Sequence, residues 1–61
     1  MKREDLLRHL RQHGCRPLRE GRGHSIWVNP ANDSKGSIPR HREVNDYTAR
    51  GACRQLGVPE P

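Results

Sequence analysis

His24 is the residue of this sequence best suited to acid–base chemistry. It follows the segment Gly21-Arg22-Gly23, in which two glycines allow backbone angles that are closed to other residues. The unperturbed pKa of a histidine side chain lies near neutrality, so histidine can both accept and donate a proton. A cation beside it suits phosphodiester chemistry, because it can stabilise negative charge on phosphate. An ordinary hairpin turn with a solvated histidine and arginine is the alternative interpretation.

The composition of the chain is strongly basic. Twelve Lys and Arg residues stand against seven Asp and Glu residues, giving a formal net charge of +5, and ten of the twelve cations are arginines. A guanidinium group is planar and can bind phosphate or carboxylate at two points. The charge therefore predicts a nucleic acid or an acidic protein as partner. It does not predict membrane binding, because the only amphipathic helix near the N-terminus is short and lacks a broad apolar face.

The length of 61 residues predicts a single domain, 1–61, with a small core. Apolar residues make up 30% of the chain, with no Phe, one Trp and one Tyr, so we expect marginal stability. No apolar run approaches the length of a signal sequence or a membrane span, which predicts a cytoplasmic protein. Cys15 and Cys53 are then expected to be reduced, with a disulfide between them as the alternative.

The sequence predicts no metal site and no cofactor. Cys15 and Cys53 do not form a paired CxxC motif, which zinc sites commonly use. His9 and His13 are spaced to chelate a metal on a helix, but the segment lacks the glutamate of HExxH and an obvious third ligand.

Hydrophobic spacing and turn residues predict two helices that flank three short strands. Gly14 is expected to end the first helix and Gly57 the second, while Pro17 indicates an edge strand. The segment Pro30–Gly36 is expected to be a loop. The expected elements are Arg3–His13, Cys15–Glu20, His24–Asn29, Ser37–Arg40 and a helix from Asn45 or Asp46 to Leu56. This order favours an α+β fold with both helices on one face of the sheet and the other face open.

Alternation in the second strand separates Ile26 and Val28 from Ser25 and Trp27. We expect Ile26 and Val28 to pack on the helices. Trp27 would then lie on the open face, where it could stack on a base or anchor a partner. The alternative is that Trp27 belongs to the core.

Three segments carry a resemblance to a known family: a first helix ending at Gly14-Cys15, a glycine–histidine turn running into HSIWVNP, and IPRHREV before a helix that ends QLGV. In this order and at these spacings the chain resembles the HicA toxins, small ribonucleases of bacterial toxin–antitoxin systems. The resemblance implies a double-stranded-RNA-binding-domain-like fold with a three-stranded antiparallel sheet. It also implies mRNA as substrate and a HicB-like antitoxin as partner, in a toxin–antitoxin hetero-oligomer.

The catalytic histidine of that family opens the second strand, and the matching residue here is His24. The family usually has glycine and then a small hydroxyl residue before the histidine, where this chain has Arg22 and Gly23; Ser25 could supply the hydroxyl. Because RNA carries its own nucleophile, we expect cleavage by a base, an acid and positive charge rather than a metal ion. The expected RNA contacts are Arg22, Gly23, Ser25, Trp27, Lys35, Arg40 and His41, with His41 also a candidate acid.

Two other functions are compatible with the same residues. In the first, the chain is a non-catalytic RNA-binding module that uses its first helix and the Arg40-His41-Arg42 cluster to bind phosphates. In the second, it is a basic interaction subunit without affinity for RNA. The basic cluster by itself could also be solvated surface.

Overall fold

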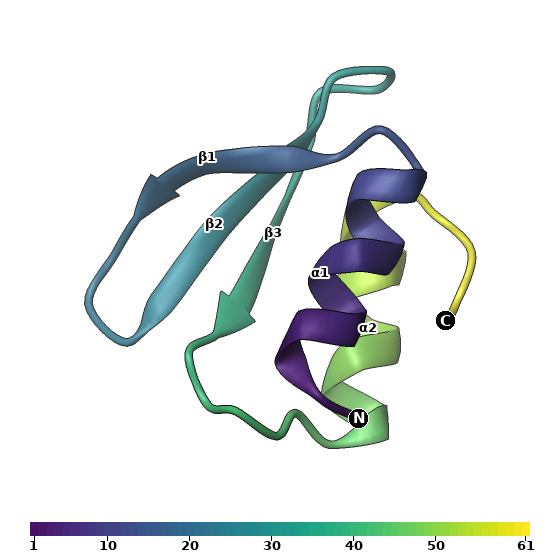
Figure 1. The fold of residues 1–61 in the computed structure, drawn as a ribbon. Coiled ribbons are helices and arrows are strands. Elements are labelled where there is room, and N and C mark those ends of the chain that lie inside the picture. The colour runs from purple at the N-terminus through teal and green to yellow at the C-terminus, as the bar shows by residue number, and fades with distance from the viewer.

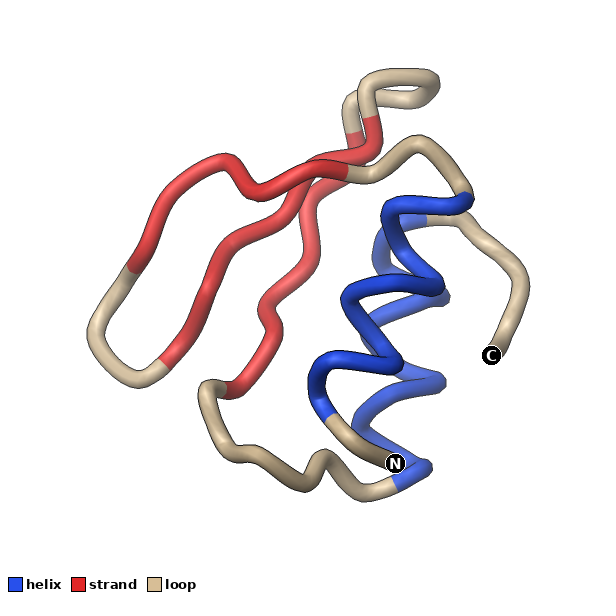
Figure 2. Tube along the Cα trace, viewed as in Figure 1, coloured by secondary structure: helices blue, strands red, loops and turns tan.

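The computed structural model describes all residues, 1–61, as a helix, three strands and a second helix (Figure 1). The strands form one antiparallel sheet in the order β1-β2-β3, and Figure 2 shows the two helices beside each other on one side of it. The elements are α1 (Arg3–Gln12), β1 (Arg16–Glu20), β2 (His24–Asn29), β3 (Ser34–Pro39) and α2 (Asp46–Leu56). The expected α+β class and order of elements are confirmed.

The third strand begins three residues earlier than expected, at Ser34 rather than Ser37, and it ends at Pro39 rather than Arg40. Asparagine side chains tighten the preceding turn: Ala31 N–H donates to Asn29 Oδ1 at 3.1 Å, and Ser34 N–H donates to Asn32 Oδ1 at 2.9 Å. The turn therefore closes within a few residues, and the chain from Ser34 onward is free to pair with β2.

The two faces of the sheet are the reverse of the expected assignment. Ser25, Trp27 and Asn29 are buried, with Trp27 only 2% exposed, whereas Ile26 and Val28 are half-buried on the face away from the helices. The placement of Trp27 on the open face is therefore wrong, and the core alternative holds. Its β3 partner is Gly36, where the close approach of α2 leaves no space for a side chain. A Cβ at Gly36 would lie 2.9 Å from Leu56 Cγ.

The core is a single cluster between the helices and the inner face of the sheet. Its buried apolar members are Leu6, Leu10, Cys15, Trp27, Ile38, Val44, Ala49, Ala52, Cys53 and Leu56. The inner polar residue Asn29 is satisfied, because its Nδ2 donates to the Leu56 carbonyl at 2.8 Å. Cys15 and Cys53 are free thiols, and burial raises the pKa of both.

The expected ends of α2 are confirmed. Asn45 precedes the helix, and its side-chain oxygen accepts a hydrogen bond from Thr48 N–H at 2.7 Å, which satisfies one of the free donors of the first turn. Gly57 ends the helix in the left-handed region, at φ 71°. Neither helix of the protein is long and apolar enough to cross a membrane.

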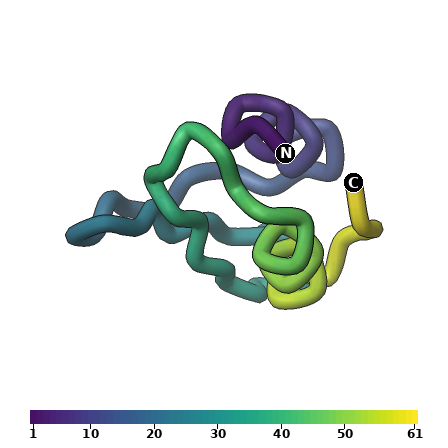
Figure 3. The backbone as a smooth tube through the Cα atoms, turned by 90° about the horizontal axis from the view of Figure 1, so that it is seen from below, coloured from purple at the N-terminus to yellow at the C-terminus, as the bar shows by residue number.

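The start of the chain is tied to the connection between β3 and α2. Arg3 N–H donates to the Arg42 carbonyl and Val44 N–H donates to the Met1 carbonyl, both at 2.8 Å, and Lys2 pairs with Glu43 in an antiparallel bridge. Figure 3 shows this connection passing beside the start of α1. These bonds fix two basic segments, distant in sequence, next to each other.

Candidate functional site

His24 lies at the start of β2, directly after a tight turn. Gly21 N–H donates to the His24 carbonyl at 2.8 Å, so Arg22 and Gly23 form the tip of the turn. Gly23 has φ +76°, a conformation that glycine adopts without strain. Arg40 N–H donates to the Gly23 carbonyl at 3.3 Å, which ties the turn to the end of β3. The His24 side chain is exposed at this fixed position.

The face of the sheet away from the helices, here called the open face, presents His24 together with three cations. Paired residues of neighbouring strands point to the same side, and the register pairs Arg16 with Val28, Arg19 with Ile26, and Lys35 with Val28. His24 is on this side because it alternates with the buried Ser25. The side chains of Arg16, Arg19 and Lys35 are exposed and form no ion pair. Their charges are free to meet an anionic ligand.

Sequence analysis did not identify Arg16 and Arg19 as site residues. A bulge at Leu18 lies between Pro17 and Arg19 in the pairing of β1 with β2. A bulge adds one residue to a strand, so two residues three positions apart can share a face. Simple alternation would place Arg16 and Arg19 on opposite faces. The unusual density of arginines in this strand was the available signal.

A chain of four polar side chains supports the turn from the inner side of the sheet. Ser25 is fully buried; its Oγ accepts a hydrogen bond from Arg3 Nη2 at 2.8 Å and donates one to Glu20 Oε1 at 2.7 Å. Arg3 Nε also donates to the Pro39 carbonyl at 2.9 Å. Glu20 in turn forms an ion pair with Arg40, with 2.9 Å between Oε1 and Nη2. We call Arg3, Ser25, Glu20 and Arg40 the polar chain.

The structure separates the remaining predicted site residues into exposed and buried ones. Arg22, Gly23, Lys35, Arg40 and His41 are all exposed. The first two form the turn, Lys35 lies on the open face, and the last two follow β3.

Two predicted RNA contacts lie inside the fold. Ser25 belongs to the polar chain, and the Trp27 ring is in the core, with the Arg11 guanidinium carbon 5.2 Å from its centroid. Neither side chain is available to a ligand on the open face, because strand alternation directs both toward the helices.

These features define a small, basic α+β domain that holds an exposed histidine at a glycine turn, on a sheet face with free cations. The chain belongs to the HicA toxin family: the model of this family, described as the HicA toxin of bacterial toxin–antitoxin systems, matches residues 3–58 of the 61. The protein is therefore the toxin of a toxin–antitoxin system. Comparison with curated proteins and with solved structures gives no match.

Proposed function

We propose that this toxin is an endoribonuclease that cleaves mRNA, with His24 as the general base. The neutral imidazole accepts the proton of a ribose 2′-hydroxyl, and the 2′-oxygen attacks the adjacent phosphorus. The bond from phosphorus to the 5′-oxygen breaks, which leaves a 2′,3′-cyclic phosphate on one fragment. The leaving 5′-oxygen takes a proton from a second group, for which the exposed His41 is the candidate that the sequence offers. General acid–base assistance of this kind contributes about 10²–10⁴ in rate.

The observation that carries this proposal is the exposure of His24 on the cationic open face. Arg22 at the tip of the turn and Arg19 on the neighbouring strand are the nearest free cations in the turn and in the strand register. Cations aimed at the phosphate oxygens stabilise the charge that develops in the transition state. Hydrogen bonds hold both neighbours of His24: the polar chain binds the Ser25 side chain, and Arg40 N–H donates to the Gly23 carbonyl. The imidazole is therefore presented from a fixed position.

The partner in this proposal is a HicB-like antitoxin that covers the open face. An acidic surface would complement Arg16, Arg19 and Lys35, and complementary charge accelerates docking. In the resulting hetero-oligomer, His24 would lie beneath the antitoxin and RNA would be excluded. The cytoplasm, where mRNA is present, is the compartment in which this toxin would act.

Replacing His24 with alanine tests the catalytic assignment. We expect His24→Ala to fold normally and to bind RNA, and to cleave a labelled RNA about 10²–10⁴ times more slowly than the parent in the presence of a chelator. The matched control is His13→Ala, which removes another exposed histidine at the end of α1 and should leave the rate unchanged. Cleavage by His24→Ala at the parent rate would exclude the base. Intact RNA after incubation with the parent, together with binding, would indicate a non-catalytic module.

A further inference from the structure

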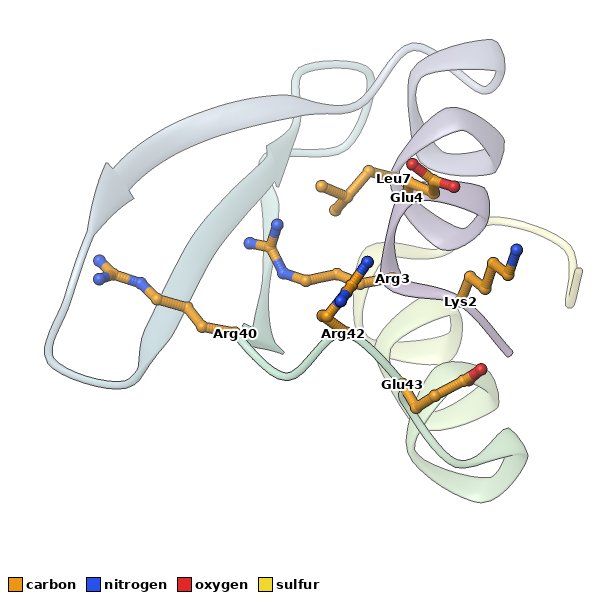
Figure 4. A pocket seen from close by; sticks show the side chains of 7 residues that line it. All are labelled: Lys2, Arg3, Glu4, Leu7, Arg40, Arg42 and Glu43. Carbon is orange, nitrogen blue, oxygen red and sulfur yellow. The ribbon is translucent and has the colours of Figure 1, made fainter.

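A second basic surface lies between the start of α1 and the connection from β3 to α2. It is a groove of about 630 Å³, here called the α1 groove, and Figure 4 shows its lining side chains. Four of them are the cations Lys2, Arg3, Arg40 and Arg42; the others are two glutamates and a leucine. Four positive charges against two negative ones favour an anionic ligand.

The cations of the α1 groove are held on a fixed scaffold. The backbone bonds between the first three residues and segment 42–44 place Lys2, Arg3 and Arg42 beside each other. The Arg3 guanidinium is oriented by its bonds to Ser25 and Pro39, which use two of its five N–H donors. The side chains of Lys2 and Arg42 form no hydrogen bond or ion pair within the protein. Donors therefore remain for a ligand.

The α1 groove reaches the end of the sheet at which the proposed catalytic residue lies. Arg40 follows Pro39, which pairs with His24 in the sheet, and the Arg40 N–H contacts the turn that carries His24. The His24 side chain points to the open face, whereas the groove lies on the helix side. A strand of RNA with one phosphate at His24 would therefore pass around this end of the sheet to place neighbouring phosphates in the groove. The polar chain connects the α1 groove with the turn that carries His24, since Arg3 and Arg40 belong to the polar chain and also line the groove.

We propose that the α1 groove is a phosphate subsite, which binds the RNA backbone on one side of the phosphate at His24. This inference rests on the proposed function, because it takes RNA as the ligand. The groove has a single apolar residue, Leu7, whereas sites for proteins commonly need buried apolar or aromatic anchors. Its two carboxylates can accept hydrogen bonds from ribose 2′-hydroxyls, which RNA carries beside its phosphates.

The salt dependence of RNA binding tests the subsite. The probe is a labelled single-stranded RNA longer than the site, and its binding is followed by fluorescence anisotropy at several salt concentrations. All proteins carry His24→Ala, so that the RNA stays intact. Each phosphate contact on a single strand contributes about 0.7 to the slope of log K against log salt concentration. We expect Lys2→Ala with Arg42→Ala to lower the slope by about 1.4.

The matched control is Arg50→Ala, which removes an exposed and unpaired cation of α2 that does not line the α1 groove. We expect this variant to keep the full slope. The groove variant should keep the parent melting temperature, because Lys2 and Arg42 make no side-chain hydrogen bond.

Three results would overturn the subsite. The first is an unchanged slope for the groove variant. The second is a loss of about 0.7 for Arg50→Ala, half the loss expected for the two groove substitutions, which would mean that only total charge matters. The third is binding of poly-glutamate that depends on Lys2 and Arg42 while the RNA slope stays constant, which would identify a protein site. Failure of the parent to cleave RNA would refute the proposed function separately, since the slope is measured without cleavage.

Discussion

Replacing Trp27 tests which face of β2 builds the core. Trp27 is 2% exposed, and truncation of a buried Trp to Ala costs about 3–5 kcal/mol. The core of a domain this small supplies in total about 3–5 kcal/mol. We therefore expect Trp27→Ala to be largely unfolded at room temperature. Trp27→Phe removes two ring carbons and the indole nitrogen and should cost about 1.6 kcal/mol, at roughly 0.8 kcal/mol for each carbon removed from the core.

The assay is urea unfolding followed by far-ultraviolet circular dichroism, which does not depend on the tryptophan itself. The matched control is Ile26→Ala, a truncation of the neighbouring residue, which is half-buried on the open face. It should lose no more than about 2 kcal/mol, because only part of its side chain is withdrawn from water. A Trp27→Ala variant with the parent midpoint would refute the assignment of the inner face.

Fluorescence provides an independent measurement of the same assignment, because Trp27 is the only tryptophan of the chain. In His24→Ala protein, saturation with RNA should leave the Trp27 emission unchanged, since the ring lies in the core and cannot stack on a base. Strong quenching by RNA would instead support the placement on the open face.

Two further predictions concern the packing of α2 and the buried thiols. Gly36→Ala should lower the free energy of unfolding by about 1–3 kcal/mol, because the new Cβ would lie 2.9 Å from Leu56 Cγ. A Cβ at Gly51 would have no atom within 4 Å, so Gly51→Ala should stabilise the helix by up to about 1 kcal/mol. Urea unfolding measures both changes. The pKa values of Cys15 and Cys53 are raised by burial, so the folded state holds the two thiol protons more tightly than the unfolded state does. This contribution to the free energy of unfolding should be fully present below the ordinary thiol pKa of about 8.5 and should fall as the pH rises above it. Urea midpoints at about pH 7.5 and 9.5 measure this fall, and equal midpoints would contradict it.

Local signals predicted those parts of the fold that local interactions decide. The Asn45 cap and the Gly57 terminus of α2 depend on bonds within a few residues, and the structure has both. The bounds of β2 and the edge position of β1 were also predicted. The start of β3 was missed, because the asparagine turn that shortens the loop depends on side-chain bonds that composition does not reveal.

The sequence predicted where His24 lies in the fold, but it did not predict the cations that surround it. His24 directly follows a glycine turn in the sequence, and this local turn is enough to place it, exposed, at the start of β2. Arg16 and Arg19 join it through the register and the bulge of β1, which are properties of strand pairing. The polar chain and the α1 groove combine residues from the start of the chain with residues about 20 and 40 positions later, which no local pattern connects.

The sequence by itself determined the order of the elements, the excess of arginine and the presence of a histidine at a flexible turn, because each depends on residue types or on spacing along the chain. Only the tertiary structure decided which face of the sheet is buried. Alternation divides a strand into two faces without saying which one meets the helices. In the structure α2 packs against the face that carries Gly36 and its partner Trp27, so Trp27 is buried and His24 lies among the arginines of the opposite face.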